Sequence, residues 1–341
     1  MSTSPSRQTH ARSPRVALIT GITGQDGGYL AEQLLVEGMV VHGLVRPGDS
    51  AAVAELLERS PDVVLHEGDL ADGQRVGDLV GEIAPDEIYN LGGISSVAFS
   101  WEHPVLTAQL SGVAAATVLE AAWQLQESSG RPVSVVQASS AEMFGDADES
   151  PQTELTPVRP VSPYGAAKAF AHHMTRIYRG RGLASSSCIL FNHESPRRPD
   201  TFVTRKITAA AARIGVEGSG VIRLGNLDAS RDWGWAPDYV DALVRSARTS
   251  TPGDFVIASG TTHTVAEFAE AALRRAGVGD DWRQHVEVAE EFFRPVDATT
   301  MVGDAGKARR ELGWEPTVPF QEVVGRMVDH DLGLQKAGAN E

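Results

Sequence analysis

Tyr164 and Lys168 lie four positions apart, in a segment that reads Tyr-Gly-Ala-Ala-Lys. On a helix, positions i and i+4 share one face, so a phenol and an ammonium group would be neighbours. A nearby positive charge stabilises a phenolate and lowers the pKa of a tyrosine from about 10, which would let Tyr164 accept a proton from a hydroxyl group. An ordinary surface pair is the alternative, but chance gives only about 0.06 such pairs in a chain so poor in Tyr and Lys.

A serine and a glutamate follow one apolar run closely enough to act beside this pair. The run covers residues 132–138, and Ser140 and Glu142 come directly after it. Open α/β sheets bind ligands at the carboxyl ends of their strands, where the Ser140 hydroxyl could bind the alcohol that Tyr164 deprotonates. Glu142 could remove a carbon-bound proton, a step that elimination of water needs and simple oxidation does not. Taken alone, Glu142 could equally be a loop carboxylate.

A glycine-rich turn provides a candidate site for a dinucleotide. Gly21, Gly24 and Gly27 form a GxxGxxG pattern between an apolar run at residues 16–20 and helical spacing at residues 29–36. Glycines let the backbone approach a pyrophosphate, and the following helix N-terminus offers free N–H groups. A tight strand-to-helix connection would also use glycines, so the dinucleotide interpretation depends on the flanking elements and on the Tyr–Lys pair.

The residue after the second apolar run indicates which nicotinamide cofactor is used. An acid there would bind the ribose of NAD, but this chain has Arg46, which can pair with the 2′-phosphate of NADP. The sequence therefore favours NADP, and a bound oxidised nicotinamide would also help to lower the pKa of Tyr164. Asp69 and Leu70 follow the third run, where a carboxylate could bind the adenine amino group or be an ordinary loop residue. We assign no metal site.

These residues need a scaffold, and the pattern of apolar runs predicts one. Runs at residues 16–20, 39–45, 62–66, 87–91, 132–138 and 184–191 alternate with helix-like stretches. This alternation predicts an α/β fold with a doubly wound parallel sheet. Past residue 192, basic and Pro/Gly-containing segments dominate. We predict a disordered tail over 1–14, an NADP-binding domain over 15–192, and a smaller α/β lobe over 193–341, mainly for substrate, from which the chain can cross back to the sheet.

Composition limits the classes of partner. The chain has 341 residues and a net charge of −15, which repels nucleic acid and anionic membranes, so an anionic substrate needs a local basic site. Its single cysteine, Cys188, permits no intrachain disulfide. No continuous apolar run approaches the roughly 20 residues that span a bilayer. We expect a cytoplasmic protein with no nucleic-acid or membrane partner.

Several segments together resemble one family, the GDP-mannose 4,6-dehydratases, a branch of the extended short-chain dehydrogenases/reductases with a Rossmann-like fold. In order, they are GITGQDGGYLAEQLL, PDEIYNLGG, QASSAEMFG, SPYGAAKAFA, ILFNHESPRR, FVTRKI, LGNLDASRDWG, DYV and FRP. The resemblance extends from about residue 15 to about residue 320. GxxGxxG and YxxxK are common to the superfamily, whereas FNHESPRR, FVTRK and the LGN…RDWG pattern are specific to this branch.

The resemblance implies a role for each matching residue. The implied catalytic residues are Ser140, Glu142, Tyr164 and Lys168. The implied cofactor-binding residues are Gly21, Gly24, Gln25, Asp26, Gly27, Arg46, Asp69, Leu70, Leu91, Ser95, Tyr164, Lys168, His193 and Arg198. Those implied for GDP-mannose are Asn192, Val203, Lys206, Leu224, Arg231 and Arg294. Lys206, Arg231 and Arg294 would form a basic set for a diphosphate, although such residues also occur as scattered surface charge.

The resemblance also implies a reaction. Tyr164 would deprotonate the C4 hydroxyl as hydride passes to NADP⁺, and Glu142 would take the C5 proton as water leaves C6. Return of the hydride to C6 and of a proton to C5 would then give GDP-4-keto-6-deoxy-mannose. The sequence leaves open which group protonates the leaving hydroxyl. Two alternatives remain: a sugar-nucleotide 4-reductase or epimerase, against which Glu142 argues, and a non-enzymatic NADP-binding sensor, which would not need Glu142, Tyr164 and Lys168 together.

The sequence departs from the family pattern at four positions and in one loop. Ile94 and Ser96 stand where the family has Gln and His, Leu106 replaces a Tyr, and Ala141 replaces a Ser. The loop after Arg46 is short; in the family it reaches a neighbouring subunit's cofactor in a tetramer. Since all four catalytic positions are occupied, we expect activity to survive. We expect a homo-oligomer, with a dimer favoured and a tetramer as the alternative.

Overall fold

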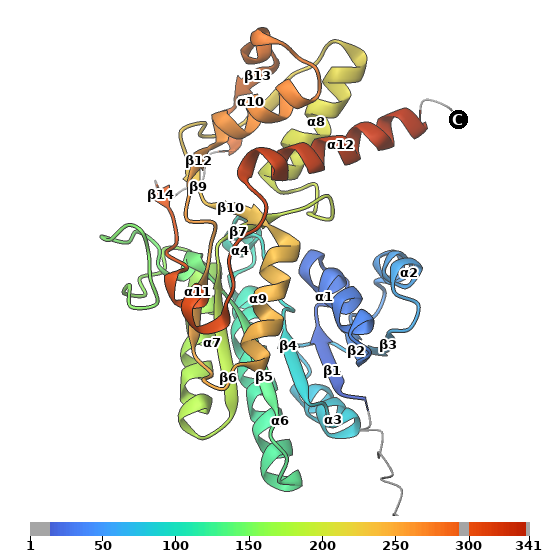
Figure 1. Ribbon diagram of the computed structural model, residues 1–341, viewed down its shortest axis with the longest axis vertical. Coiled ribbons are helices and arrows are strands. Elements are labelled where there is room, and N and C mark those ends of the chain that lie inside the picture. Colours follow the sequence, from blue (N-terminus) through green and yellow to red (C-terminus); the bar gives the residue numbers. More distant parts are fainter. Residues whose placement is uncertain (1–13, 293–299, 339–341) are drawn as a thin grey trace, which may run out of the picture.

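The main sheet has the predicted doubly wound parallel form. The computed structural model describes residues 14–292 and 300–338. Within that part of the chain, seven parallel strands lie in the order β11-β6-β5-β4-β1-β2-β3 (Figure 1). Their bounds are β1 Val16–Thr20, β2 Val40–Val45, β3 Val64–Glu67, β4 Glu87–Asn90, β5 Ser134–Ser140, β6 Ala184–Leu190 and β11 Asp254–Ile257. The order reverses direction at β1, so a crevice forms beyond the carboxyl ends of β1 and β4.

Helices cover both faces of this sheet, and the strands other than the edge strand β3 are largely buried on both sides. On one face lie α1 (Gln25–Val36), α9 (Ala236–Arg248) and α11 (Gly306–Leu312); on the other lie α3 (Gly73–Ile83), α6 (Ala114–Ser129) and α7 (Pro163–Gly180). Alternate residues of β1 face opposite sides, since Leu18 packs with α3 and α6 while Ile19 packs with α1. Burial on both faces explains why the strands read as continuous apolar runs rather than alternating ones.

A second group of helices packs beyond the carboxyl edge of the sheet, at the top of Figure 1. It comprises α8 (Val203–Glu217), α10 (Val265–Arg275) and α12 (Phe320–Gly338). These helices share a separate apolar core in which the ring of Trp233 lies edge-on to Phe268, 5.2 Å between centroids. The short strands with them are β7 Asn192–Glu194, β8 Ile222–Leu224, β9 Ser230–Arg231, β10 Trp233–Trp235, β12 His263–Thr264, β13 Val286–Val288 and β14 Thr300–Met301.

The shorter helices connect these layers. They are α2 Ser50–Arg59, α4 Val97–Glu102, α5 Pro104–Ala108, the π-helical turn Gln109–Val113, and the 3₁₀ turns Ala141–Met143, Asp280–His285 and Glu290–Phe292. Strand β11 and helix α9 return to the main sheet from beyond residue 193. The domain boundary at 192/193 stays a prediction. The predicted tail lies outside the described residues except for Pro14.

One continuous helical stretch, Pro104–Ser129, is long and apolar enough to cross a membrane by length and composition alone. No single apolar run in the sequence marks it, because small and polar residues interrupt it. Half of its most apolar window is buried inside the protein, where Val118 and Leu119 pack against the sheet. Core helices of globular domains meet the same length and composition criterion.

Candidate active site

A cavity of about 370 Å³ lies at the carboxyl ends of the central strands. It gathers residues that the sequence predicted from separate segments. Those that line it are Asp26, Leu91, Ser95, Ser140, Glu142, Tyr164, Lys168, Asn192, His193, Arg198, Val203, Lys206, Leu224 and Arg231. All four proposed catalytic residues and most of the proposed substrate-binding residues therefore share one space. Arg294 lies outside the described residues.

The remaining predicted cofactor residues surround the glycine turn. Gly21 has a φ of +70°, and a Cβ added at Gly27 would lie 2.3 Å from the Gly21 carbonyl oxygen, so the turn needs glycine at both positions. Helix α1 begins directly after Gly24, which supplies no side-chain cap to its N–H groups. The turn thus has the backbone shape and open helix end that hold a pyrophosphate. Gln25 lies just inside this helix, buried.

Arg46, Asp69 and Leu70 lie beyond the two strands that follow this turn. Arg46 is exposed directly after β2. The carboxylate of Asp69 accepts a hydrogen bond from the backbone N–H of Ala71, 2.8 Å. Leu70 packs so close to Gly92 that a Cβ there would meet its Cδ1 at 2.4 Å. Their placement at the strand ends agrees with their predicted positions, and their contacts with a cofactor stay a prediction.

The proposed acid–base residues come from β5 and α7. Ser140 ends β5, and its hydroxyl accepts a hydrogen bond from the Glu142 backbone N–H at 3.2 Å, which fixes the turn that carries Glu142. Tyr164 is buried, with its pKa raised to about 12 by desolvation; a hydrogen bond with Ser140 lowers the pKa, and the nearby Glu142 charge raises it. The three side chains are thus close enough to interact electrostatically, as a shared acid–base site requires.

Lys168 lies one turn beyond Tyr164 on α7. Its Nζ donates to the Ala138 carbonyl oxygen at 2.9 Å and lies 5.8 Å from the centre of the Tyr164 ring. Burial lowers the pKa of Lys168 to about 8, although Asp26 acts in the opposite direction. We expected Lys168 to lower the pKa of Tyr164, but in the protein alone burial dominates and the phenol stays protonated at neutral pH.

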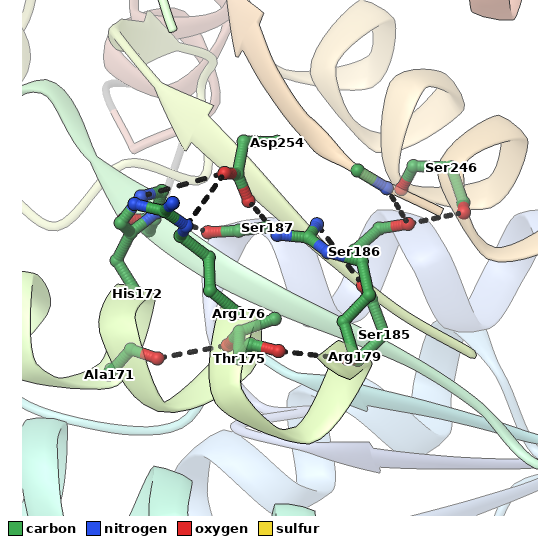
Figure 2. Close-up of polar contacts among 12 residues, drawn as sticks. Ala171, His172, Thr175, Arg176, Arg179, Ser185, Ser186, Ser187, Ser246 and Asp254 are labelled. Atoms are coloured by element: carbon green, nitrogen blue, oxygen red, sulfur yellow. Dashed lines mark hydrogen bonds and ion pairs between the residues drawn. The ribbon is translucent and has the colours of Figure 1, made fainter. Parts of the chain in front are cut away.

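Figure 2 shows how α7 is held against the sheet two turns beyond Tyr164. The buried His172 is within 2.9 Å of the Ser187 hydroxyl on β6, and Arg179 donates to Asp254 on β11 at 2.7 Å. Burial lowers the pKa of His172 to about 4, so the imidazole is neutral and bonds as a polar group rather than as an ion. These contacts, far apart in sequence, fix the register of the helix that carries Tyr164 and Lys168.

A second polar cluster connects the glycine turn to the segment after β6. His193 pairs with Asp26 at 2.8 Å, and Gln25 donates both to Asp26 and to the His193 carbonyl. Ser195 donates in turn to Gln25 at 2.8 Å. Burial alone would lower the pKa of His193, but the Asp26 carboxylate outweighs it and raises the pKa above its usual value. Asp26 and His193 were predicted separately; the structure shows that they form one hydrogen-bonded unit.

The far end of the cavity contains the predicted basic residues. Lys206 lies over the ring of Phe292, 3.6 Å from its centre, and burial lowers the pKa of its ammonium. Arg231 is buried and lines the same cavity. Sequence reasoning missed Phe292 and Arg223, which also line it. Arg223 precedes the predicted Leu224 in a strand, but no motif marks it.

Of the four residues that depart from the family pattern, two line the cavity and two lie outside it. Ser96 and Ala141 line the cavity, whereas Ile94 and Leu106 do not. Ser96 caps α4 by accepting the Phe99 N–H at 3.2 Å, and Ile94 bonds through its backbone to Ser111.

No group of three or more His, Cys, Asp or Glu among the described residues is arranged to hold a metal ion.

The doubly wound sheet, the glycine turn before α1 and the Ser–Tyr–Lys site on β5 and α7 define an extended short-chain dehydrogenase/reductase. Two solved structures share this fold over nearly the whole chain. UDP-glucose 4-epimerase of Thermus thermophilus, in complex with NAD, is 27% identical with a TM-score of 0.80, covering 93% of this chain and 99% of that one. dTDP-glucose 4,6-dehydratase of Streptomyces venezuelae, with NAD bound, has a TM-score of 0.80 at 23% identity, covering 95% and 98%.

Sequence comparison identifies the branch. Residues 18–327 match the family described as GDP-mannose 4,6 dehydratase, and the chain belongs to that family. GDP-mannose 4,6 dehydratase 1 of Arabidopsis thaliana is 44% identical over 331 residues, covering 94% of this chain and 91% of the relative. The Homo sapiens GDP-mannose 4,6 dehydratase is 40% identical, covering 95% and 93%. The family resemblance inferred from the sequence motifs is confirmed.

Proposed function

We propose that this protein is a GDP-mannose 4,6-dehydratase, which converts GDP-mannose to GDP-4-keto-6-deoxy-mannose and water. The observation that carries the proposal is Glu142, which shares the cavity with Ser140, Tyr164 and Lys168. Solved structures with this fold include an epimerase and a dehydratase, so the fold alone does not choose between the reactions. A carboxylate base beside the Tyr–Lys pair, in a chain whose relatives carry the dehydratase name, favours elimination.

The proposed cofactor is NADP. A nicotinamide dinucleotide fits the glycine turn, and two structures of the same fold contain NAD. Arg46 favours the 2′-phosphate form, because it stands exposed directly after β2, where a guanidinium can pair with a phosphate. Asp49, which sequence reasoning missed, accepts a 3.3 Å hydrogen bond from Thr23 of the glycine turn. The Asp49 carboxylate adds negative charge beside the glycine turn, and that charge acts against a 2′-phosphate. The preference for NADP therefore depends on the positive charge of Arg46.

Replacement of Arg46 by Asp should therefore weaken NADP binding more than NAD binding. The expected loss for NADP is about tenfold or more, since the change removes a charge-assisted pair and adds a like charge. Affinities of both cofactors for the parent and the variant, measured by fluorescence titration, give the comparison. Equal affinities for the two cofactors in the parent protein would contradict the proposal.

The proposed chemistry assigns a step to each side chain. A nicotinamide cofactor held at the glycine turn would supply the hydride chemistry, as acceptor of the C4 hydride and donor to C6. Tyr164 takes the C4 hydroxyl proton while Ser140 holds the same oxygen through its own hydroxyl. Because the pKa of Tyr164 is about 12 in the protein alone, the positive charges of Lys168 and of the oxidised nicotinamide must together lower it in the complex.

Elimination then depends on Glu142. A ketone at C4 acidifies the C5 proton, and Glu142 removes that proton as the C6 hydroxyl takes up a proton and leaves as water. Hydride return to C6 is matched by addition of a proton at C5, so the two protons taken by Tyr164 and Glu142 are both used again. Two alternatives make different demands. A 4-reductase or epimerase would not need Glu142, and a reductase would consume reduced cofactor; a sensor would need neither Tyr164 nor Lys168 at the reacting position.

One incubation tests the function. The purified protein, given GDP-mannose and catalytic NADP⁺, should yield a product lighter by one water, with no net change in reduced cofactor. Mass spectrometry of the nucleotide sugar and the absorbance of reduced nicotinamide provide the two readings. A product of unchanged mass would instead support the epimerase. Stoichiometric consumption of NADPH in a parallel incubation with a 4-keto sugar nucleotide would support the reductase.

We further propose a homo-oligomer, a dimer in preference to a tetramer, in the cytoplasm, with no nucleic-acid or membrane partner. Exposed apolar side chains recur two helical turns apart, at Val105 and Val113 on the stretch before α6 and at Phe170 and Ile177 on α7. Helices α6 and α7 pack side by side, so these side chains suit a helix-pair contact between subunits. Light scattering at micromolar concentration should give a dimer mass, and a stable tetramer would refute this assignment.

A further inference from the structure

Arg223 lies at the edge of the substrate cavity, in a position that no family motif identifies. It is the middle residue of β8, between two buried neighbours, and its own side chain is about half exposed. The strand carries it beside the proposed substrate residues: Leu224 follows it directly, and Lys206 lies close enough for the Arg223 charge to lower its pKa, after the larger effect of burial. The cavity therefore has a cation at its edge in addition to Lys206 and Arg231.

Two carboxylates hold Arg223 in place. Glu287 on β13 is its partner in the parallel register, with 3.3 Å between Arg223 Nε and Glu287 Oε1. Glu291, in the turn after β13, lies 2.9 Å from Arg223 Nη1. The turn is fixed by close backbone packing, because a Cβ at Gly225 would lie 2.6 Å from the Phe292 carbonyl oxygen.

Glu291 interacts with two of the cations at this end of the cavity, Arg223 and Lys206. It pairs directly with Arg223, and its charge raises the pKa of Lys206 against the effect of burial. Glu291 does not itself line the cavity, but by interacting with an arginine and a lysine at once it competes for the charges that an anionic ligand would use. A diphosphate carries more charge than a carboxylate, and its oxygens match the fork of a guanidinium.

We propose that Arg223 is a further specificity-determining residue, which binds the diphosphate of the nucleotide sugar, and that Glu291 competes with the phosphate groups for the Arg223 guanidinium. This inference rests on the proposed function, because it assumes that the ligand of the cavity is a nucleoside diphosphate. Ligand binding exchanges the Arg223–Glu291 pair for an Arg223–phosphate pair, while Glu287 keeps the guanidinium oriented from the other side. Glu291 then selects for highly charged ligands, because a weaker anion cannot displace it.

Calorimetric titration of the purified full chain with GDP and with guanosine tests the inference. Arg223→Met should weaken GDP binding about fivefold, the scale of one partly exposed charge pair, and should leave guanosine binding unchanged because guanosine has no phosphate. Glu291→Gln should tighten GDP binding about twofold or more, since the competing carboxylate is gone. In turnover of GDP-mannose, Arg223→Met should raise KM and leave kcat within about twofold.

Arg274→Met is the matched control. Arg274 is also about half exposed and also held by two carboxylates, Glu270 and Asp280, but it lies on α10 and does not line the cavity. It should leave GDP affinity unchanged. If Arg223→Met behaves like Arg274→Met while the parent binds GDP and dehydrates GDP-mannose, the inference is wrong and the proposed function stands.

Titration with UDP separates the remaining outcomes. If the parent neither binds GDP nor dehydrates GDP-mannose but binds UDP in a manner that depends on Arg223, the phosphate role of Arg223 is supported and the substrate assignment fails. If the parent binds neither nucleoside diphosphate, the proposed function and the inference both fail.

Discussion

Replacement of Glu142 by Gln should lower the turnover of GDP-mannose at least about a hundredfold, the lower range for loss of a general acid–base residue. The glutamine keeps the size of the side chain and removes the base that takes the C5 proton. Ser140, Tyr164 and Lys168 remain. In the proposed reaction they act at the C4 oxygen rather than at C5. Oxidation at C4 should therefore survive, and the variant loaded with NADP⁺ should accumulate reduced cofactor on addition of GDP-mannose.

Single-turnover absorbance of reduced nicotinamide, together with mass analysis of the sugar product, distinguishes the two steps. The matched control is Glu149→Gln, which changes an exposed carboxylate in the loop that follows Glu142 and outside the cavity. The control should turn over like the parent. A Glu142→Gln enzyme within a few-fold of the parent would show that Glu142 is a loop carboxylate, and the dehydratase proposal would then lack a base.

The fold was predictable because its strands are short, mostly buried on both faces except at the edge strand β3, and bounded by turns. The run at residues 16–20 coincides with β1, and the glycine turn and α1 follow it as expected. Parallel strands bring their carboxyl ends to one edge, so a prediction of strand order was not needed to place Ser140 and the glycine turn near one another. Motif resemblance supplied the substrate residues, whose types and spacing alone would not have marked them.

Contacts over long separations were not predictable. Asp26 pairs with His193 across 167 positions, and neither residue lies in a pattern that names the other. Strand β11 lies in the segment that we assigned mainly to the second lobe. We did not predict it as a strand of the sheet, because its four residues form too short a run to stand out. Arg223 meets Glu287 only because β13 pairs with β8, a contact between residues 64 positions apart. Such features depend on which elements meet in space, which local periodicity does not encode.

The pKa of Tyr164 is a further property that the sequence did not predict. From the sequence, the neighbouring ammonium of Lys168 predicts a lowered pKa; in the structure, desolvation raises it to about 12. The extent of burial is a property of the folded cavity, and it works on both members of the pair. It disfavours the phenolate of Tyr164 and the ammonium of Lys168 alike, so the site carries a folding cost that catalysis requires.

Because burial disfavours the Lys168 ammonium, the stability of the protein should depend on pH. This is the second large effect that we expect. The pKa of Lys168 is about 8 in the folded protein, against 10.5 for a lysine side chain in water. Between these values the unfolded chain binds more protons than the folded one, so the free energy of unfolding rises with pH. Below pH 8 both states are protonated, and the full penalty for burying the charge remains. From pH 7 to pH 9.5 the expected gain in stability from this one residue is about 2 kcal/mol.

Lys168→Met should remove that gain and also lower turnover about a hundredfold, because the charge that helps to deprotonate Tyr164 is lost. Urea unfolding of the parent and the variant at pH 7 and pH 9.5 measures how much the free energy of unfolding of each protein changes. Both pH values lie below the range in which Tyr164 titrates. Lys307→Met is the matched control: its ammonium also donates to a backbone carbonyl, that of Asp254 at 2.8 Å, but it is only partly buried and lies outside the cavity. The control should keep the parent's gain and its turnover. If the parent and Lys168→Met gain equally between the two pH values, burial does not depress the pKa of Lys168, and the ammonium stays charged in the site across this range.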